Sequence, residues 1–170
     1  MEKLGLGSNK ISSIKPLLKA NFLELKELYF SENEISDIKI LEKVVFEKLE
    51  KLDLSKNNIS NIKKLESAYF KELKELNLNY NNISDIKVMD KIQFEKLEKL
   101  GLGGNYISNI SGFENSNLKE LKELYLFENE ISDIKVFEKA KFDKLEKLDL
   151  TKNKISNLKP LENARMTQLP

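Results

Sequence analysis

Residues 49–72 read LEKLDLSKNNISNIKKLESAYFKE, and this stretch decides the fold because the whole chain repeats it with variation. Its first half has the form LxxLxLxxNxIS. The two leucines of LDL alternate with polar residues, which is the period-2 pattern of a short strand with one buried face. From the end of this motif onward, Ile59, Ile62 and Leu65 fall three residues apart. That spacing suits tight turns or 3₁₀ segments whose apolar side chains point inward.

The asparagine at the ninth position of this stretch recurs every 24 residues without an insertion or deletion, at Asn9, Asn33, Asn57, Asn81, Asn105, Asn129 and Asn153. Cutting the chain eight residues before each asparagine gives seven units, 1–24, 25–48, 49–72, 73–96, 97–120, 121–144 and 145–168, with the start of an eighth at 169. One coil cannot bury its apolar side alone, so stability must come from stacking. The sequence therefore predicts one repeat domain over residues 1–170.

These units resemble the leucine-rich repeat family over the whole chain. The signature LxxLxLxxNxI occurs seven times in register, with Met1 replacing the first leucine and Phe30 replacing another. The later half of each unit departs from the commonest versions, so no subfamily is assigned. The resemblance implies an α/β fold, a right-handed solenoid (horseshoe) with a parallel β-sheet on its concave face and short helical or 3₁₀ turns on its convex face. It also implies that the repeating asparagine hydrogen-bonds backbone groups of adjacent coils.

Three further features of the repeat carry structural expectations. Positions 17–23 of each unit, such as LEKVVFE over residues 41–47, suit a helical turn. Position 22 predicts a stacked spine formed by Phe22, Phe46, Phe70, Phe94 and Phe142 and continued by Leu118 and Met166. Position 12 is always serine, which we interpret as a turn residue that bonds to the backbone rather than as a nucleophile.

The composition closes most routes to catalysis. The 170 residues include 29 Lys+Arg and 28 Asp+Glu, a formal net charge of +1, with no cysteine and no histidine. Thiol nucleophiles, disulfides, thiolate metal sites and the commonest general base are therefore absent. The GLGG stretch at 101–104 does not complete a dinucleotide loop, because Tyr106 stands where that pattern needs glycine. We expect no enzyme activity, no cofactor, no metal and no nucleic-acid partner.

Charge alternates from one unit to the next. Position 2 reads Glu, Lys, Glu, Lys along the chain, and position 3 reads the reverse. Stacked strands would then place each lysine beside glutamates, and a slip by one unit would oppose like charges, so the pairs fix register. Copies stacked end to end would also oppose like charges, which favours a monomer. Alternating signs cancel at a distance, so this ladder is a weaker candidate for a recognition surface.

The array also carries a longer period. Units 2 and 6 share 17 of 24 residues, so the chain looks like a duplicated four-unit block. Because neither end carries an obvious cap, we expect the chain to be a segment of a longer array. The sequence begins without a basic and then apolar leader, so cytoplasm is the default compartment, with an extracellular one left open. No apolar run approaches the ~18 residues of a membrane span, so membrane insertion is not expected.

The variable positions of the strand carry the functional prediction. Positions 5 and 7 point away from the core, and positions 8 and 10 lie at the rim. Three glycines at 101, 103 and 104 predict a shallow notch in unit 5 with aromatic side chains around it. The candidate partner-binding residues are Tyr29, Asn77, Asn79, Tyr80, Tyr106, Tyr125 and Phe127.

These residues favour a non-enzymatic scaffold that binds a protein or peptide on the concave sheet. Exposed tyrosine and asparagine would also serve a carbohydrate or another non-protein ligand. A third interpretation is a structural or engineered spacer without a partner. Tyr125 and Phe127 would then merely stack on each other and on neighbouring strands.

Overall fold

A computed structural model describes residues 1–164, in which one strand per unit pairs in parallel with the next in strict chain order. Each pairing sets a residue beside the one 24 positions later, so Leu28 lies beside Leu52 and Leu52 beside Leu76. The repeat length therefore fixes the register that the sequence predicts. The seven strands in this part of the chain are β1 (Lys3–Gly5), β2 (Glu27–Tyr29), β3 (Lys51–Asp53), β4 (Glu75–Asn77), β5 (Lys99–Gly101), β6 (Glu123–Tyr125) and β7 (Lys147–Asp149).

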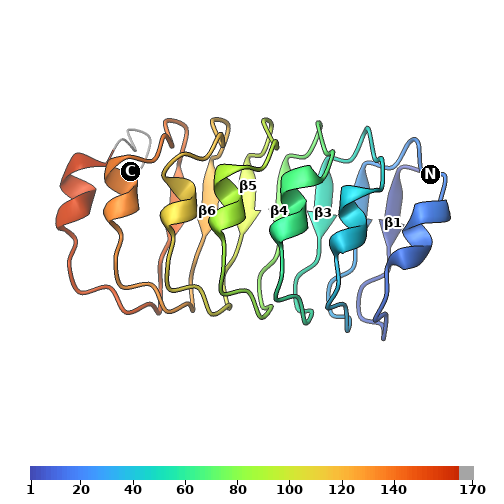
Figure 1. Cartoon of the computed structure of the whole chain (residues 1–170), viewed down its shortest axis with the longest axis horizontal. Coiled ribbons are helices and arrows are strands. Elements are labelled where there is room, and N and C mark those ends of the chain that lie inside the picture. Colours follow the sequence, from blue (N-terminus) through green and yellow to red (C-terminus); the bar gives the residue numbers. More distant parts are fainter. Residues whose placement is uncertain (165–170) are drawn as a thin grey trace.

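Each strand is followed by a loop and a short 3₁₀ helix on the opposite side of the coil. The helices within residues 1–164 are η1 (Lys15–Lys19), η2 (Lys39–Glu42), η3 (Lys63–Ser67), η4 (Lys87–Asp90), η5 (Ser111–Phe113), η6 (Lys135–Glu138) and η7 (Lys159–Asn163). Figure 1 shows the row of helices and the row of strands along the long axis of the right-handed solenoid. None of these helices is long and apolar enough to cross a membrane.

The helical turn begins at position 15 of each unit and ends at positions 17 to 19, so the predicted bounds, positions 17–23, are wrong. The side chain at position 13 explains the early start. Asp37 Oδ1 accepts a hydrogen bond from the backbone N–H of Lys39 at 2.9 Å, and Asn61 Oδ1 accepts one from Lys63 at 2.9 Å. The turn is thereby closed just where the helix begins. The chain has left the helix by position 20, where Ala68 is extended with φ −75° and ψ 135°.

The serines at position 12 do not bond to the backbone, so that prediction is also wrong. Their side chains are exposed and make no hydrogen bond within residues 1–164, at Ser12, Ser36, Ser60, Ser84, Ser108, Ser132 and Ser156. The residue that follows each serine performs the turn role instead. An acceptor placed one position later reaches the N–H two residues further on, whereas the serine faces solvent.

The repeating asparagine forms the predicted ladder between coils. The amide nitrogen of Asn57 donates to the carbonyl oxygens of Phe30 at 2.9 Å, Leu54 at 3.1 Å and Ser55 at 3.1 Å. Its oxygen accepts from the backbone N–H of Ile35 at 2.9 Å. One buried side chain thus joins its own turn to the preceding coil, and every polar atom of the amide is satisfied. The same arrangement repeats at Asn33, Asn81, Asn105 and Asn129.

Stacked phenylalanines run through the side of the core that faces the helices. The ring centroids of Phe22 and Phe46 lie 6.4 Å apart, those of Phe46 and Phe70 also 6.4 Å, and those of Phe70 and Phe94 5.8 Å. The spine changes at unit 5, where buried Leu118 occupies the position. There the ring of Phe113, from η5, packs edge-on against Phe142 at 5.7 Å. The predicted member Met166 lies outside the described residues.

Candidate binding face

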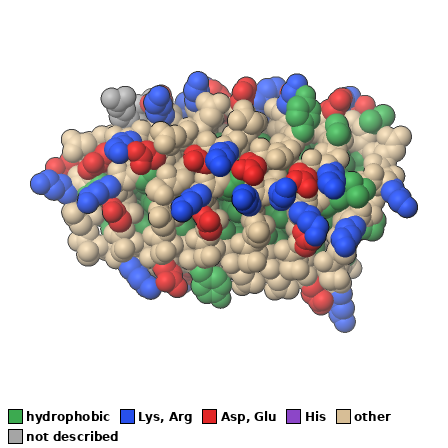
Figure 2. Space-filling view, viewed as in Figure 1, with side chains coloured by type: hydrophobic (Ala, Val, Ile, Leu, Met, Phe, Trp, Pro, Cys, Tyr) green, Lys and Arg blue, Asp and Glu red, His purple; other side chains and the backbone are tan. Residues whose placement is uncertain are grey.

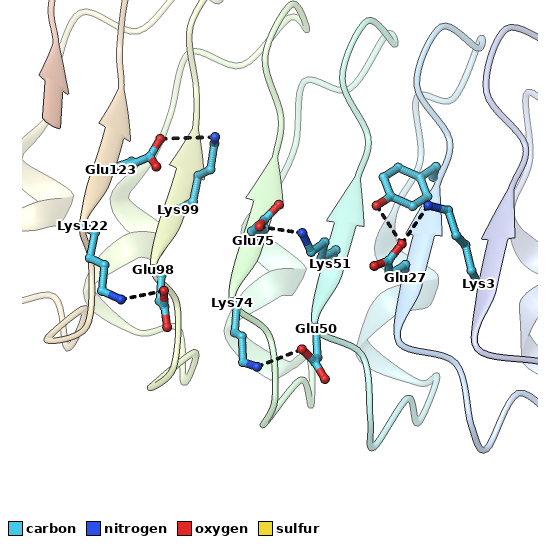
Figure 3. A network of polar contacts seen from close by, with 11 residues as sticks. Lys3, Glu27, Glu50, Lys51, Lys74, Glu75, Glu98, Lys99, Lys122 and Glu123 are labelled. Carbon is cyan, nitrogen blue, oxygen red and sulfur yellow. Dashed lines mark hydrogen bonds and ion pairs between the residues drawn. The ribbon is translucent and has the colours of Figure 1, made fainter. Parts of the chain in front are cut away.

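Figure 3 shows the charge ladder that borders the strands. Lysine and glutamate pair across neighbouring strands as predicted, but each odd-numbered unit pairs with the unit that follows it rather than with both neighbours. The six pairs in positions 2 and 3 are Lys3–Glu27 (3.0 Å), Lys26–Glu2 (3.0 Å), Lys51–Glu75 (2.8 Å), Lys74–Glu50 (2.8 Å), Lys99–Glu123 (3.2 Å) and Lys122–Glu98 (2.8 Å). Partly exposed pairs of this kind contribute little stability individually, so register is their main effect.

Two tyrosines stand on the concave face beside members of this ladder. The hydroxyl of Tyr29 donates to Glu27 Oε2 at 3.0 Å, and the Lys3 ammonium lies 4.8 Å from the ring centroid. Burial and the nearby Glu27 carboxylate raise the pKa of Tyr29 above its ordinary value. The Tyr29 hydroxyl therefore remains protonated at neutral pH and available as a donor.

Tyr125 repeats this arrangement four units later. Its hydroxyl donates to Glu123, and this bond lowers the pKa of Glu123, assisted by Lys99. The ammonium groups of Lys99 and Lys147 lie 5.3 Å and 4.8 Å from the Tyr125 ring centroid. These lysines belong to the strands on either side, so cation–π attraction to both of them holds the Tyr125 ring in place.

Phe127 joins Tyr80 and Tyr125 in one group, which we call the aromatic cluster. The Phe127 ring lies 5.8 Å from Tyr80 and 6.5 Å from Tyr125, the latter in an edge-on arrangement. Phe127 and Tyr125 are half-buried, and Tyr80 is 44% exposed. None of the three belongs to the hydrophobic core, so the cluster is an apolar surface that the fold does not require.

The predicted notch over the three glycines of unit 5 is not open. A Cβ atom added to Gly103 would lie 2.5 Å from the Phe127 ring, and one added to Gly104 would lie 2.4 Å from the Tyr80 ring. Similarly, Gly101 is covered by the amide groups of Asn77 and Asn79, 2.8 to 2.9 Å from such a Cβ. Each glycine thus makes room that a larger neighbour fills, and Gly101 and Gly103 are themselves buried.

The depression lies beside the cluster instead, across β2 to β6. This concave hollow has a volume of about 350 Å³. Tyr29 bounds one end and Tyr125 with Phe127 bounds the other, while Asp53, Asn77 and Gly101 occupy the position-5 row between them. Its remaining lining residues are Lys51, Leu52, Glu75, Leu76, Asn79 and Lys99.

The amides at the centre of the hollow are only partly engaged. Asn77 Oδ1 accepts from the backbone N–H of Asn79 at 3.1 Å, and Asn79 Oδ1 accepts from that of Gly103 at 2.7 Å. Within the part of the chain that the structure describes, neither amide nitrogen donates a hydrogen bond. Two pairs of N–H groups are therefore available to a ligand in the hollow.

Comparison with known proteins identifies the repeat. A family model described as "Leucine Rich repeats (2 copies)" matches residues 47–91, 71–115, 95–139 and 119–163. The chain belongs to the leucine-rich repeat family. A search of curated proteins finds no significant match.

Solved leucine-rich repeat structures superpose on the whole solenoid. An internalin from Listeria monocytogenes is 29% identical, with a TM-score of 0.80 over 100% of this chain and 46% of that one. A leucine-rich repeat protein of Leptospira interrogans is 29% identical, with a TM-score of 0.79 over 99% of this chain and 41% of that one. The chain thus spans less than half the length of either.

A plant peptide hormone receptor, RGFR1, solved in complex with RGF2, is 21% identical, with a TM-score of 0.67 over 89% of this chain and 24% of that one. At this identity the match reflects the fold alone.

The structure brings together six of the seven residues that the sequence selects. Tyr29, Asn77, Asn79, Tyr125 and Phe127 line the concave hollow, and Tyr80 joins them through Phe127. The seventh, Tyr106, is 57% exposed and pairs with no other ring within residues 1–164. Sequence reasoning omitted Lys51, Asp53 and Lys99. The sequence could have indicated them, because Lys51 and Lys99 occupy position 3 of their units and Asp53 occupies position 5.

A larger hollow, about 640 Å³, lies on the helix side between η3, η4 and η5. Figure 2 shows that this face of the leucine-rich repeat array carries a band of alternating basic and acidic side chains. Asp85, which lines this hollow, is already bonded to the backbone N–H of Lys87 at 2.9 Å. The approach of neighbouring coils here is close, since a Cβ on Gly112 would lie 2.3 Å from the carbonyl oxygen of Ile86. This hollow is lined by residues of the three helices and of the turns that precede them.

The chemistry available on the concave face is that of binding. Among residues 1–164 no three carboxylates, histidines or cysteines converge as ligands for a metal ion. The face offers aromatic rings, amide donors, paired lysines and the Asp53 carboxylate. These groups form hydrogen bonds and apolar contacts, which is the usual composition of a recognition surface.

Proposed function

We propose that this chain is a non-enzymatic scaffold that binds a protein or peptide partner on its concave sheet face. The aromatic cluster of Tyr80, Tyr125 and Phe127 carries this proposal, because the core does not require it. Rigid aromatic side chains beside small and polar residues are typical of binding hot spots. The adjoining hollow adds hydrogen-bonding groups that would orient a partner.

Similarity of fold supports the same role. The plant receptor with a related solenoid is a peptide hormone receptor and was solved in complex with RGF2. Because folds host many functions, this likeness is an analogy, and the cluster remains the observation specific to this chain.

The test compares capture by three forms of the chain. The double variant Tyr125→Ala, Phe127→Ala removes most of the cluster, and Tyr69→Ala is a matched control. Tyr69 is 47% exposed and follows η3, away from the strands. Immobilised chains are incubated with a proteome-wide library of displayed protein fragments, after thermal melts show that all three fold alike.

We expect fragments that the wild type and Tyr69→Ala retain but the double variant loses. Equal retention by all three forms would contradict binding through the cluster. A glycan array run in parallel distinguishes the alternative ligand class. Saturable binding of glycans without any retained protein fragment would replace the proposal with carbohydrate recognition.

A further inference from the structure

The concave hollow is chemically different at its two ends. One end combines Tyr29 with the Asp53 carboxylate, and the other combines Tyr125 with Phe127. We propose that the hollow binds an extended peptide segment with a basic side chain at the Asp53 end and a large apolar side chain at the Phe127 end. This inference rests on the proposed function and names the class of partner.

The charge that remains in the hollow is negative and belongs to Asp53. Lys51 is paired with Glu75 at 2.8 Å, and Lys99 with Glu123 at 3.2 Å, so these charges compensate one another. Asp53 makes no ion pair within residues 1–164, and its Oδ1 accepts only from the backbone N–H of Ser55, at 2.9 Å. The second carboxylate oxygen is free to accept from a lysine or arginine, which gives a charge-assisted hydrogen bond.

The neighbouring tyrosine adds a second attraction for a cation. Tyr29 lies beside Asp53 in the parallel register of β2 and β3. Lys3 of β1 lies over the Tyr29 ring at 4.8 Å, on the side away from the hollow. The other side of the ring faces the hollow and can contact the stem or the head of a basic side chain.

The middle of the hollow suits a peptide backbone. The amide nitrogens of Asn77 and Asn79 donate no hydrogen bond within residues 1–164, and carbonyl oxygens are the acceptors that every peptide offers. Gly101 lies beneath these two amides and adds no side chain of its own to the middle of the hollow. The middle of the hollow therefore contributes affinity that depends little on the sequence of the peptide.

The distance between the ends sets the spacing of the two anchors. Asp53 and Phe127 belong to units three apart, and strands lie about 4.8 Å from one another, so the ends are about 14 Å apart. An extended chain rises about 3.3 Å per residue. The basic and apolar side chains should then be separated by about four residues.

The experiment selects random 12-residue peptides, displayed on phage, on the immobilised chain. Enriched peptides should share a lysine or arginine about four positions from a leucine, isoleucine, phenylalanine or tryptophan, because side chains of an extended segment alternate and only an even spacing turns both anchors toward the hollow. The best peptide is then synthesised, and its affinity is measured by fluorescence anisotropy against wild type, Asp53→Asn and Asp149→Asn. Asp149 is the matched control because it also occupies position 5, makes the same bond to a backbone N–H (Thr151, 3.0 Å) and lies outside the hollow.

We expect Asp53→Asn to weaken binding about tenfold, as the loss of one hydrogen bond to a charged group would, and Asp149→Asn to change it less than about twofold. Replacing the peptide's basic residue by glutamine should cost the same factor with wild type and nothing further with Asp53→Asn. Peptides that require Tyr125 and Phe127 but tolerate Asp53→Asn would overturn this inference and leave the scaffold standing. A selection that yields no peptide dependent on either end would contradict both proposals.

Discussion

Units 1 and 2 carry nearly the same strand sequences as units 5 and 6, yet only unit 6 contributes rings to the aromatic cluster, which Tyr80 of unit 4 completes. Units 2 and 6 share 17 of 24 residues, including the ELY strand. Both tyrosines bond to a glutamate, and both have a lysine over the ring. On the open strand face the two units differ at one position, Ser31 against Phe127.

That single difference changes the surface around it. A Cβ on Gly7 would meet the Ser31 hydroxyl at 3.1 Å and the Ser31 carbonyl oxygen at 3.3 Å. In unit 5 the equivalent glycine, Gly103, lies under the Phe127 ring, which would be 2.5 Å from such a Cβ. The tyrosine and its ion pair occur in both units, so the repeat preserves them for stability. Phe127 occurs in only one of the two units and distinguishes that place on the concave face.

The two regions should differ most in the stability that is lost when an asparagine of the ladder is removed. Asn105 is buried and makes four hydrogen bonds, three as donor and one as acceptor, whereas Asn9 is exposed and makes two. Asn105→Ala leaves several buried backbone groups unsatisfied, so we expect a loss of about 3 kcal/mol in the free energy of unfolding. Asn9→Ala should cost about 1 kcal/mol or less, because water replaces its bonds. Urea denaturation measures both, and equal losses would contradict the role assigned to burial.

A smaller difference in stability is expected when a methyl group is added to the glycine next to Phe127 or to the glycine next to Ser31. Gly103→Ala forces the Phe127 ring aside and should lower the free energy of unfolding by about 1 kcal/mol. Gly7→Ala meets the Ser31 hydroxyl at 3.1 Å and the Ser31 carbonyl oxygen at 3.3 Å, looser contacts than those at Gly103, and should cost less. Urea denaturation of the two variants checks this. A neutral Gly103→Ala would show that Phe127 does not rest on unit 5.

The ion pairs should make the two regions respond alike and weakly to pH. Hydrogen bonds from Lys3 and Tyr29 lower the pKa of Glu27 below its ordinary value of 4.5, and bonds from Tyr125 and Lys99 lower that of Glu123. Pairing with Glu2 raises the pKa of Lys26 above its ordinary value of 10.5, and pairing with Glu98 does the same for Lys122. The contribution of the glutamates to stability is fully present when the pH is above their ordinary pKa, and it is lost as the pH falls through the lowered pKa. The contribution of the lysines to stability is fully present when the pH is below their ordinary pKa, and it is lost as the pH rises through the raised pKa.

The midpoint of urea unfolding should therefore be flat between about pH 6 and pH 9 and fall on both sides. Because these groups are largely exposed, 1 M salt should reduce the change. A midpoint that kept rising from pH 6 to pH 9 would contradict this assignment of the ion pairs.

Periodicity was enough to predict the fold, because the buried leucines and the asparagine ladder depend only on residues 24 apart. The helix boundary was missed because it depends on one side-chain bond, Asp37 to the N–H of Lys39, that composition does not reveal. The prediction of an open notch in unit 5 was wrong for a different reason. Whether a glycine leaves a hollow depends on the rotamers of neighbours on adjacent coils, here Tyr80 and Phe127, which the sequence pattern does not contain.

The most direct measurement is a map of backbone amide chemical shifts on adding a peptide selected by the chain. Two hollows described above offer alternative sites, the smaller on the sheet side and the larger between η3, η4 and η5. We predict that the shifts concentrate in β3 to β6 and around Asn79, Gly103 and Phe127. Shifts centred on the residues between η3 and η4, with the concave face unchanged, would contradict recognition through the aromatic cluster.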